Sequence, residues 1–491
     1  MRPTTSFHSV SCFLAITAVV LVLTGCQSAG TQEESSATSQ TVDQRVDAIT
    51  GAVLPVALVE GEPAETTALS ELMQSSRVPA VSVAVMRDGK LEWARGVGEV
   101  EAGSGEAVTA DTLFQAASIS KPVAAAAALS MVEDGLLDLD EDVNAKLKGW
   151  KVPSNEWTEQ QPVTLRGLLT HTAGMTVHGF PGYPHDAPIP STVDVLDGKG
   201  NTDPVRVDIL PGSRWRYSGG GYTVLQKLMV DAAGKPFAEI VRERVLEPAG
   251  MKHSTFEMTL TPARLDATAT AHDRQGGRVA GRFHRYPEQA AAGLWTTPSD
   301  LVRFARAIQR SHAGKKGGIL SQEMAREMLT PGMQNWGLGP TIGGEGTRFG
   351  HGGANMGFRC SLTASIEDGW AVAVMTNSDS GGLVARQLVS TVAASNGWEG
   401  LEPPRRKVVE IGAKALAKLA GRYQIGEAGL EFEAVGDRLF ADVPGQGRLE
   451  FLPQSETVVV QRDDGRVITF VMEGDRVTGF ESPGISAQRV D

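Results

Sequence analysis

The sequence predicts an α+β fold, in which both ends of the main region form one antiparallel sheet with helices on its faces and an inserted helical lobe. Two hairpins predict the sheet. Residues 80–86 and 91–97 flank Asp88-Gly89, and residues 358–366 and 370–376 flank Asp368-Gly369. Asp-Gly between apolar strand-like runs is a strong hairpin signal. Because helical patterns fill the chain between the hairpins, we expect a cleft where the lobe meets the sheet.

A second, all-β region is predicted at the C-terminus. Residues 402–406 (Glu-Pro-Pro-Arg-Arg) have the composition of a linker, and residues 417–491 hold short apolar runs separated by Gly-Asp and Asp-Gly turns. Regularly spaced short strands of this kind indicate a meander or a small barrel. We therefore predict an accessory β-barrel-like domain over 401–491, in which the sequence shows no catalytic constellation.

Length and composition describe an ordinary globular protein with an acidic balance. The 491 residues allow two or three domains, and 41% hydrophobic and 21% charged residues are typical of a soluble fold. The net charge of −12, without any basic run, argues against a nucleic-acid partner.

The N-terminus has the pattern of an export signal. Arg2 precedes an apolar run over 13–23 that is short for a membrane span, and the segment ends at Leu23-Thr24-Gly25-Cys26. This ending resembles the bacterial lipoprotein processing box, which implies a signal peptide over 1–25, cleavage before Cys26 and lipid attachment to its sulfur. A simple signal peptide with a stray cysteine and an uncleaved anchor are the alternatives.

Residues 26–43 are rich in Ser, Thr, Gln and Glu and are predicted to be a flexible tether. The expected location is therefore outside the cytoplasm, on a bacterial membrane, at its periplasmic or cell-surface face. Of three cysteines, Cys12 lies in the signal and Cys26 is the proposed lipid site. Cys360 then has no disulfide partner, and its apolar surroundings predict a small buried side chain.

The first chemical motif is Ser118-Ile119-Ser120-Lys121. An alanine-rich run follows Lys121 and ends before Gly135, so a helix is expected from the region of Ser118 to about Asp134. Residues three apart on a helix lie on one face, which brings the hydroxyl and the amine together. A serine needs a base to become a nucleophile, and a lysine kept neutral by burial can be that base.

Two Gly-rich stretches carry further candidates. Tyr217 begins Tyr217-Ser-Gly219-Gly-Gly at the end of a long irregular segment over 176–216, where a Gly-rich turn could hold its phenol in a cleft. His351 begins His351-Gly352-Gly353-Ala354 just before the last hairpin of the main region. Glycines there would let a substrate or another segment approach the strand closely.

Taken together and in this order, these motifs resemble the serine β-lactamase and penicillin-binding-protein superfamily, on its class C β-lactamase, esterase and D-peptidase side. The resemblance covers roughly residues 50–400, and we place the hydrolase domain at 44–400. Three further stretches resemble family landmarks: Leu168–Gly174, Glu247–Met251 and Gly293–Asp300.

The resemblance implies an acyl-enzyme on Ser118, with Lys121 as its base and Tyr217 as the proton shuttle to and from the leaving group. His351 occupies a position where the family has Lys or His. The backbone N–H groups of Ser118 and Ala354 would form the oxyanion hole, and Gly219, Gly352 and Gly353 would line the substrate. His171 belongs to a stretch that usually supports the site, although it could also be a base. His178 and His185 are expected to be solvated.

The sequence departs from the family pattern at two places. Many relatives have Asn where Gly219 stands, so an amide that could hold a substrate carbonyl is absent. His351 is mostly neutral at pH 7, whereas a lysine would offer a permanent charge for a carboxylate. Both changes favour an ester or amide hydrolase over an efficient β-lactamase.

The expected substrate is a small-molecule or peptide acyl compound, whether ester, amide or β-lactam, and no metal or other cofactor is expected. His-Glu-x-x-His and Cys-x-x-Cys are absent. The alternative function is a penicillin-binding-like or non-catalytic binding protein that keeps the fold without efficient turnover.

Overall fold

The computed structural model describes residues 41–491 apart from 427, 444–446, 463–464 and 484. The predicted signal peptide, Cys26 and nearly all of the predicted tether lie outside the described residues. The first helix, α1, begins at Val42. Among the residues that the structure describes, no helix combines the length and the apolar character needed to cross a membrane.

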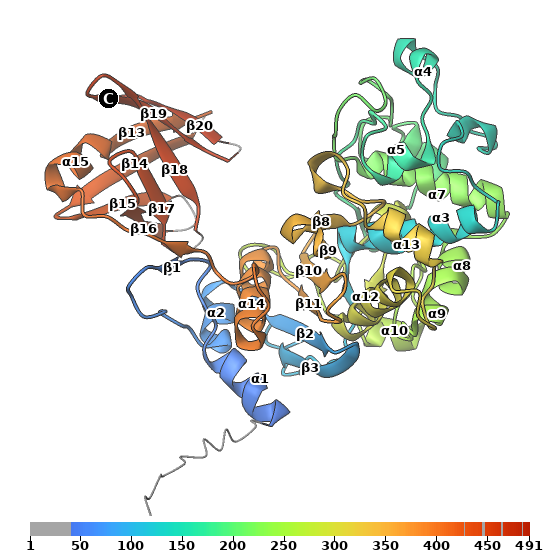
Figure 1. Cartoon of the computed structure of the whole chain (residues 1–491), viewed down its shortest axis with the longest axis horizontal. Coiled ribbons are helices and arrows are strands. Elements are labelled where there is room, and N and C mark those ends of the chain that lie inside the picture. The colour runs from blue at the N-terminus through green and yellow to red at the C-terminus, as the bar shows by residue number, and fades with distance from the viewer. Residues whose placement is uncertain (1–40, 427, 444–446, 463–464, 484) are drawn as a thin grey trace, which may run out of the picture. The chain divides into compact units, whose positions relative to one another are not determined.

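The predicted antiparallel sheet is confirmed. It has six strands in the order β3-β2-β11-β10-β9-β8, so the first hairpin pairs with the last through β2 and β11 (Figure 1). Its strands are β2 (Ala80–Arg87), β3 (Lys90–Gly98), β8 (Thr341–Gly343), β9 (Arg348–Asn355), β10 (Phe358–Ser365) and β11 (Ala371–Thr376). Asp88 and Gly89 both have positive φ (50° and 69°), as a type I′ turn between β2 and β3 requires.

Alternate residues of the central strands enter two different cores, because successive side chains of a strand point to opposite faces. Ala80, Ala84 and Met86 of β2 join the larger core, whereas Val81 and Val83 join a smaller one. Helix α12 (Pro298–His312) packs on the first face of β2 and β11, and α14 (Gly381–Asn396) packs on the other face. The sheet is therefore buried on both sides at its centre.

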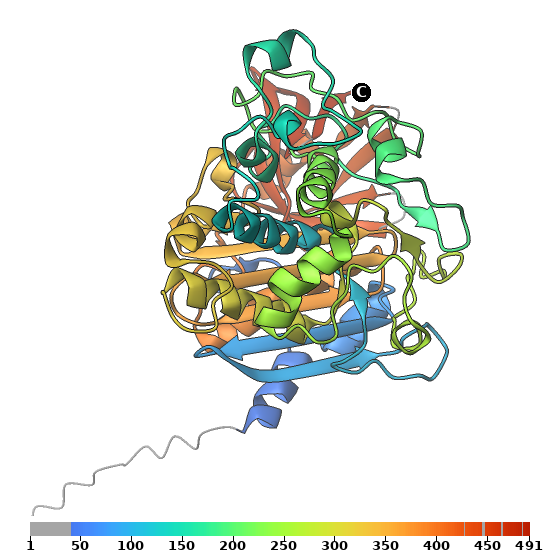
Figure 2. The same ribbon diagram turned by 90° about the vertical axis from the view of Figure 1, so that its right-hand side faces the viewer.

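The inserted lobe lies between the two hairpins in sequence, and Figure 2 shows its helices in front of the sheet. Thr297 accepts a hydrogen bond from the N–H of Asp300 and so caps the start of α12. The remaining helices of the main region are α2 (Leu69–Ser75), α3 (Ser120–Glu133), α4 (Glu156–Gln160), α5 (Leu165–Leu169), α6 (Thr192–Leu196), α7 (Gly219–Ala233), α8 (Phe237–Val241), α9 (Glu247–Ala249), α10 (Pro262–Asp266), α11 (Gln289–Ala292) and α13 (Gln322–Met328).

Short elements complete the main region. Single helical turns occur at η1 (Ala117–Ile119), η2 (Val143–Ala145), η3 (Arg242–Leu246), η4 (Met333–Asn335) and η5 (Gly344–Gly346). Two-residue strands form three pairs: β4 (Phe114–Gln115) with β7 (Trp295–Thr296), β5 (Tyr183–Pro184) with β6 (His284–Arg285), and β1 (Leu58–Val59) with β12 (Arg405–Arg406). The last pair was not predicted, because β12 falls within residues 402–406, which were expected to be a plain linker.

The C-terminal β-barrel is confirmed as a closed barrel of eight antiparallel strands. They are β13 (Gly421–Ile425), β14 (Ala428–Val435), β15 (Arg438–Val443), β16 (Gly447–Pro453), β17 (Val458–Gln461), β18 (Val467–Glu473), β19 (Arg476–Ser482) and β20 (Ile485–Arg489). Buried aromatic rings, Tyr423 and Phe432 among them, fill its core, and Leu416 and Leu419 of helix α15 (Gly412–Leu419) join them. Closure pairs β13 with β20 and so leaves no free sheet edge.

Candidate functional site

Ser118 lies in a tight turn before a helix. The structure places it in η1, so α3 begins only at Ser120, slightly later than predicted. Ala117 has φ of 49°, a left-handed conformation that is costly for a residue with a side chain. In the stretch 112–120, Ser118 is the one residue that is not fully buried. The turn therefore presents the Ser118 hydroxyl at the surface of an otherwise buried segment.

Three contacts hold this segment in place. The N–H of Ala116 donates to the carbonyl of Leu294 at 2.8 Å, and Ser120 Oγ accepts the N–H of Leu294 at 3.0 Å. The thiol of Cys360 on β10 lies 3.0 Å from the carbonyl oxygen of Ala116. Cys360 is buried, as predicted, and burial raises the pKa of its thiol to about 12. The thiol therefore stays protonated and can donate to Ala116.

Lys121 lies on the first turn of α3 and is 2% exposed. Its Nζ is 3.1 Å from Ser118 Oγ and donates to the carbonyl of Ala291 on α11 at 2.9 Å. It also lies 4.9 Å from the ring centre of Tyr217. Ser118 and Tyr217 are about 100 residues apart in sequence, yet both lie next to Lys121.

The sequence analysis expected a Gly-rich turn at Tyr217, and the structure differs from this expectation. Gly219 to Gly221 instead form the first turn of α7, whose N-cap is Ser218. A Cβ on Gly220 would lie 2.7 Å from the carbonyl oxygen of Thr176, so the missing side chain lets α7 pack closely on the long loop. Ser218 Oγ donates to the same Thr176 oxygen at 2.6 Å. Close packing at the helix start therefore fixes the position of Tyr217.

The ring of His171 packs against the ring of Tyr217. It is 2% exposed, its ring centre is 4.3 Å from that of Tyr217, and its Nδ1 accepts the N–H of Ser218 at 3.1 Å. Its carbonyl oxygen accepts the N–H of Arg216. Burial, followed by the charge of Lys121, holds the pKa of His171 well below its usual 6.5. These contacts favour a positioning role for His171 over that of a base.

His351 and the glycines after it lie on β9, beside the same cleft. His351 is buried, and its ring centre is 6.2 Å from that of Tyr217. Burial and the charge of Lys121 lower its pKa to about 3. Gly352, Gly353 and Ala354 line the cleft together with Gly219, so the structure brings all residues predicted for the site to one cavity of about 920 Å³.

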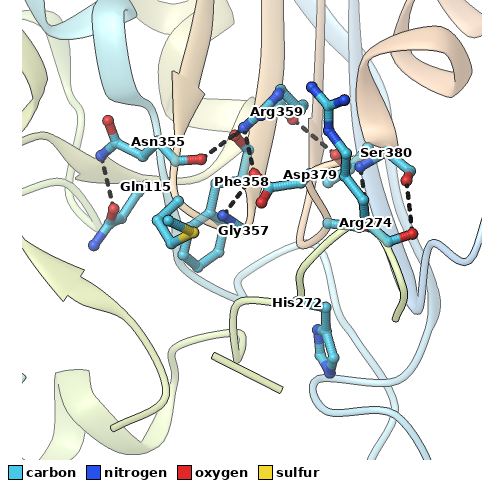
Figure 3. Close-up of polar contacts among 12 residues, drawn as sticks. Gln115, His272, Arg274, Asn355, Gly357, Phe358, Arg359, Asp379 and Ser380 are labelled. Atoms are coloured by element: carbon cyan, nitrogen blue, oxygen red, sulfur yellow. Dashed lines mark hydrogen bonds and ion pairs between the residues drawn. The ribbon is translucent and has the colours of Figure 1, made fainter. Parts of the chain in front are cut away.

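Contacts of Arg359 hold the β9–β10 turn, which follows Ala354, in position. Arg359 lies 2.8 Å from the carboxylate of Asp379 and donates to the carbonyl oxygen of Asn355 at 2.6 Å. Both contacts are drawn in Figure 3. Asp379 also accepts the N–H of Gly357, and the Asn355 amide donates to Gln115, next to the nucleophile segment. The strand bearing Ala354 is thereby fixed relative to Ser118, as an oxyanion hole requires.

An aromatic wall completes the cleft, and the sequence analysis did not identify it. Trp215, Trp336 and Phe180 line the cavity, with the Trp336 ring 5.6 Å from that of Tyr217. A tryptophan within the polar, Gly-rich stretch 331–339 was the available signal for Trp336. His178 is exposed, as expected; its ring also lies 4.9 Å from that of Tyr217, tilted by 43°, and lines the cavity. The wall suits apolar or aromatic substrate groups.

The described residues include no group of three or more His, Cys, Asp and Glu side chains placed to bind a metal ion. The groups that line the cleft include a nucleophile, an amine, a phenol, an imidazole and backbone N–H donors. This set can carry out acyl transfer through a covalent serine intermediate.

Comparison with known proteins agrees with this geometry. Residues 66–393 match the sequence profile of the family described as Beta-lactamase. The chain is 28% identical to "Penicillin-binding protein 4" of Amycolatopsis lactamdurans over 72% of this chain and 95% of that protein. It is 28% identical to "Esterase EstB" of Burkholderia gladioli over 55% of this chain and 76% of that protein.

Solved structures support the fold. The octameric penicillin-binding protein homologue from Pyrococcus abyssi superposes with a TM-score of 0.59, covering 85% of this chain and 98% of that one at 22% identity. A β-lactamase/D-alanine carboxypeptidase from Yersinia pestis superposes with a TM-score of 0.51 over 65% of this chain and 96% of that one, at 21% identity.

Gly353 provides a test of how closely the strand must approach the nucleophile. A Cβ there would lie 2.2 Å from the carbonyl oxygen of Ala116 and 2.3 Å from the Cys360 sulfur. Gly353→Ala should therefore lower the free energy of unfolding by about 1–3 kcal/mol and slow acylation of Ser118, because β9 must move away. Chemical denaturation and the labelling rate with a fluorophosphonate measure the two effects.

Gly352→Ala is the matched control for stability, since its Cβ would meet only a carbonyl oxygen at 3.9 Å. If both variants have the same unfolding free energy and the Gly353 variant is labelled at the wild-type rate, close approach at Gly353 is not required.

Glu288, just before α11, gives a pH-dependent prediction. It is fully buried, neither carboxyl oxygen has a partner among the described residues, and burial raises its pKa to about 7. Since the unfolded carboxyl has its ordinary pKa of about 4.5, the native state binds the proton more tightly, and stability falls as pH rises from about 4.5 to 7. Glu288→Gln removes this loss.

We expect Glu288→Gln to gain about 3 kcal/mol of unfolding free energy relative to wild type on going from pH 4.5 to pH 8. Denaturant titrations of both proteins at several pH values measure the difference. A difference that is the same at both ends of the range would contradict a buried, proton-binding Glu288.

Proposed function

Because this chain belongs to the Beta-lactamase family, we propose that it is an exported, lipid-anchored serine hydrolase that acts through an acyl-enzyme on Ser118. Its preferred substrates are esters with apolar or aromatic groups, rather than β-lactams. The observation that carries the proposal is the 3.1 Å contact between Lys121 Nζ and Ser118 Oγ at the edge of the cleft.

In the proposed first half-reaction, the Lys121 ammonium first releases a proton to water. Ser118 Oγ then attacks the substrate carbonyl carbon, and its proton passes to the amine of Lys121. The carbonyl oxygen becomes an oxyanion and accepts hydrogen bonds from the N–H groups of Ser118 and Ala354. The Tyr217 hydroxyl gives a proton to the leaving oxygen, whose bond to the carbonyl carbon breaks. In the second half-reaction, water attacks the carbonyl carbon of the acyl-enzyme and gives its proton to Tyr217. Lys121 returns its proton to Ser118 Oγ as the bond to the acyl group breaks.

Three features support an ester as the substrate. Gly219 offers no side-chain amide to hold an amide or β-lactam substrate. The imidazole of His351 is neutral at physiological pH and so gives no charge for a carboxylate. The wall of Trp215, Trp336 and Phe180 supplies apolar surface. In addition, a relative that is 28% identical to this chain is named "Esterase EstB".

The second candidate function is that of a penicillin-binding protein that acylates but turns over poorly. The relative named Penicillin-binding protein 4 favours it. Steady-state hydrolysis of p-nitrophenyl esters, nitrocefin and D-Ala peptides separates the two. Rapid multiple turnover of esters supports the hydrolase, whereas a single turnover with any of the three supports the binding protein.

The nucleophile is tested by intact-mass spectrometry after reaction with a fluorophosphonate. Wild type should gain one adduct, Ser118→Ala none, and Lys121→Met should react at least about a hundredfold more slowly because the base is lost. Peptide mapping distinguishes Ser118 from the neighbouring Ser120, whose hydroxyl is occupied by the backbone of Leu294. An adduct that persists in Ser118→Ala contradicts the proposal.

The proposed anchor is tested in a bacterium that grows with an alkyne-labelled fatty acid. Wild type and Cys12→Ser should carry the label, and Cys26→Ser should not, because only the Cys26 sulfur is the predicted attachment point. Fractionation should then find the Cys26 variant released from the membrane or left uncleaved. Wild-type protein without label would rule out lipidation.

A further inference from the structure

The hydrogen bonds of His351 define which of its nitrogens carries the proton. Nδ1 contacts the carbonyl oxygen of Gly352. A carbonyl oxygen can only accept, so Nδ1 is the donor, and in the neutral ring Nε2 then has a lone pair and no hydrogen. Nε2 is buried and has no partner among the described residues. His351 lines the cleft, and its buried ring thus carries an unpaired hydrogen-bond acceptor.

The surroundings of His351 keep this acceptor neutral. Burial, and after it the charge of Lys121, lowers the pKa of His351 to about 3. Its other ring neighbours are Tyr217 and Trp336, with ring centres at 6.2 and 5.4 Å. A carboxylate placed at Nε2 would therefore meet a lone pair rather than a charge or a donor.

His171, whose ring also neighbours that of Tyr217, has the opposite arrangement. Its Nδ1 accepts the N–H of Ser218, so its proton is on Nε2. Nε2 of His171 is also buried without a partner among the described residues, but His171 does not line the cleft, whereas His351 does. Of these two imidazoles, only that of His351 lines the cleft in which a substrate would bind.

We propose that His351 Nε2 determines specificity by accepting a hydrogen bond from an O–H or N–H group of a neutral acyl substrate, such as a hydroxyl or a carboxamide. Leaving a buried acceptor unpaired costs free energy, and a substrate donor removes that cost. This inference rests on the proposed hydrolase function and names the class of substrate that the same cleft selects.

The test uses three aryl acetates that share the ring and the acetyl group: 4-carbamoylphenyl, 4-acetylphenyl and 4-carboxyphenyl acetate. The first presents an N–H donor, the second only an acceptor, and the third a carboxylate. Placing the same three groups at the 3-position of the ring tests a second position of the substituent within the cleft. Each kcat/KM is divided by the rate of alkaline hydrolysis of that ester, which removes the difference in leaving-group reactivity.

In at least one of the two series, wild type should prefer the carboxamide over the ketone by about tenfold, and the carboxylate should be the poorest substrate. His351→Leu should bring the carboxamide-to-ketone ratio close to one, and His351→Gln, which keeps an acceptor, should retain part of it. His351→Lys should raise the carboxylate substrate above the ketone. Fluorophosphonate titration gives the active fraction of each variant.

His178→Lys is the matched control, because it adds a cation at another place in the same cleft. If it favours the carboxylate as much as His351→Lys does, or if His351→Leu keeps the wild-type ratio, the proposed acceptor role is wrong. A wild-type preference for the carboxylate also overturns it and assigns recognition to a cation that lines the cleft, Arg359 or Arg386. Failure of the hydrolase proposal differs from all of these, since the Ser118 adduct itself would then be absent.

Discussion

The chemistry of this cleft depends on one buried side chain, Lys121. Its Nζ bonds to the Ala291 carbonyl and contacts the Ser118 hydroxyl, while the ring of Tyr217 lies beside it. A lysine with 2% exposure has little access to water, so its protein contacts decide where its amine points. The same position explains the neutral histidines, since the charge of Lys121 acts against a second charge on His171 or His351.

The fold serves to bring three distant segments to this amine. The turn at Ala117 and the start of α3 supply Ser118 and Lys121, α11 supplies the carbonyl acceptor, and β9 supplies His351. Two contacts set the distance between β9–β10 and the nucleophile: the Cys360 thiol on the Ala116 oxygen, and the side-chain bond from Asn355 to Gln115. Both begin on the β9–β10 hairpin, which is connected to the strands β2 and β3 through β11. The sheet built from the two ends of the main region is thus also the frame of the site.

Much of this was predictable from the sequence, because the signals are local. The Asp88-Gly89 turn, the Thr297 cap and the alanine-rich helix after Lys121 each depend on a few neighbouring residues, and the structure has all three. The barrel strands were likewise separated by turn residues. The family resemblance, in turn, led to the residues that now share one cleft.

What the sequence could not indicate was contact between distant segments. The glycines after Tyr217 suggest a turn when taken alone, and only the packing of Gly220 on Thr176 makes them a helix start. The aromatic wall brings Trp215 and Trp336 from loops 121 positions apart in the numbering, and no local pattern joins them. The buried carboxyl of Glu288 and the short strand β12 are also consequences of tertiary packing.

The most direct test of the central claim is a crystal structure of the protein after reaction with an alkyl fluorophosphonate. The account predicts phosphorus bonded to Ser118 Oγ, with Lys121 Nζ within about 3 Å of that oxygen and the phosphoryl oxygen between the N–H groups of Ser118 and Ala354. Phosphorus on another residue, or a phosphoryl oxygen directed away from β9, would contradict it.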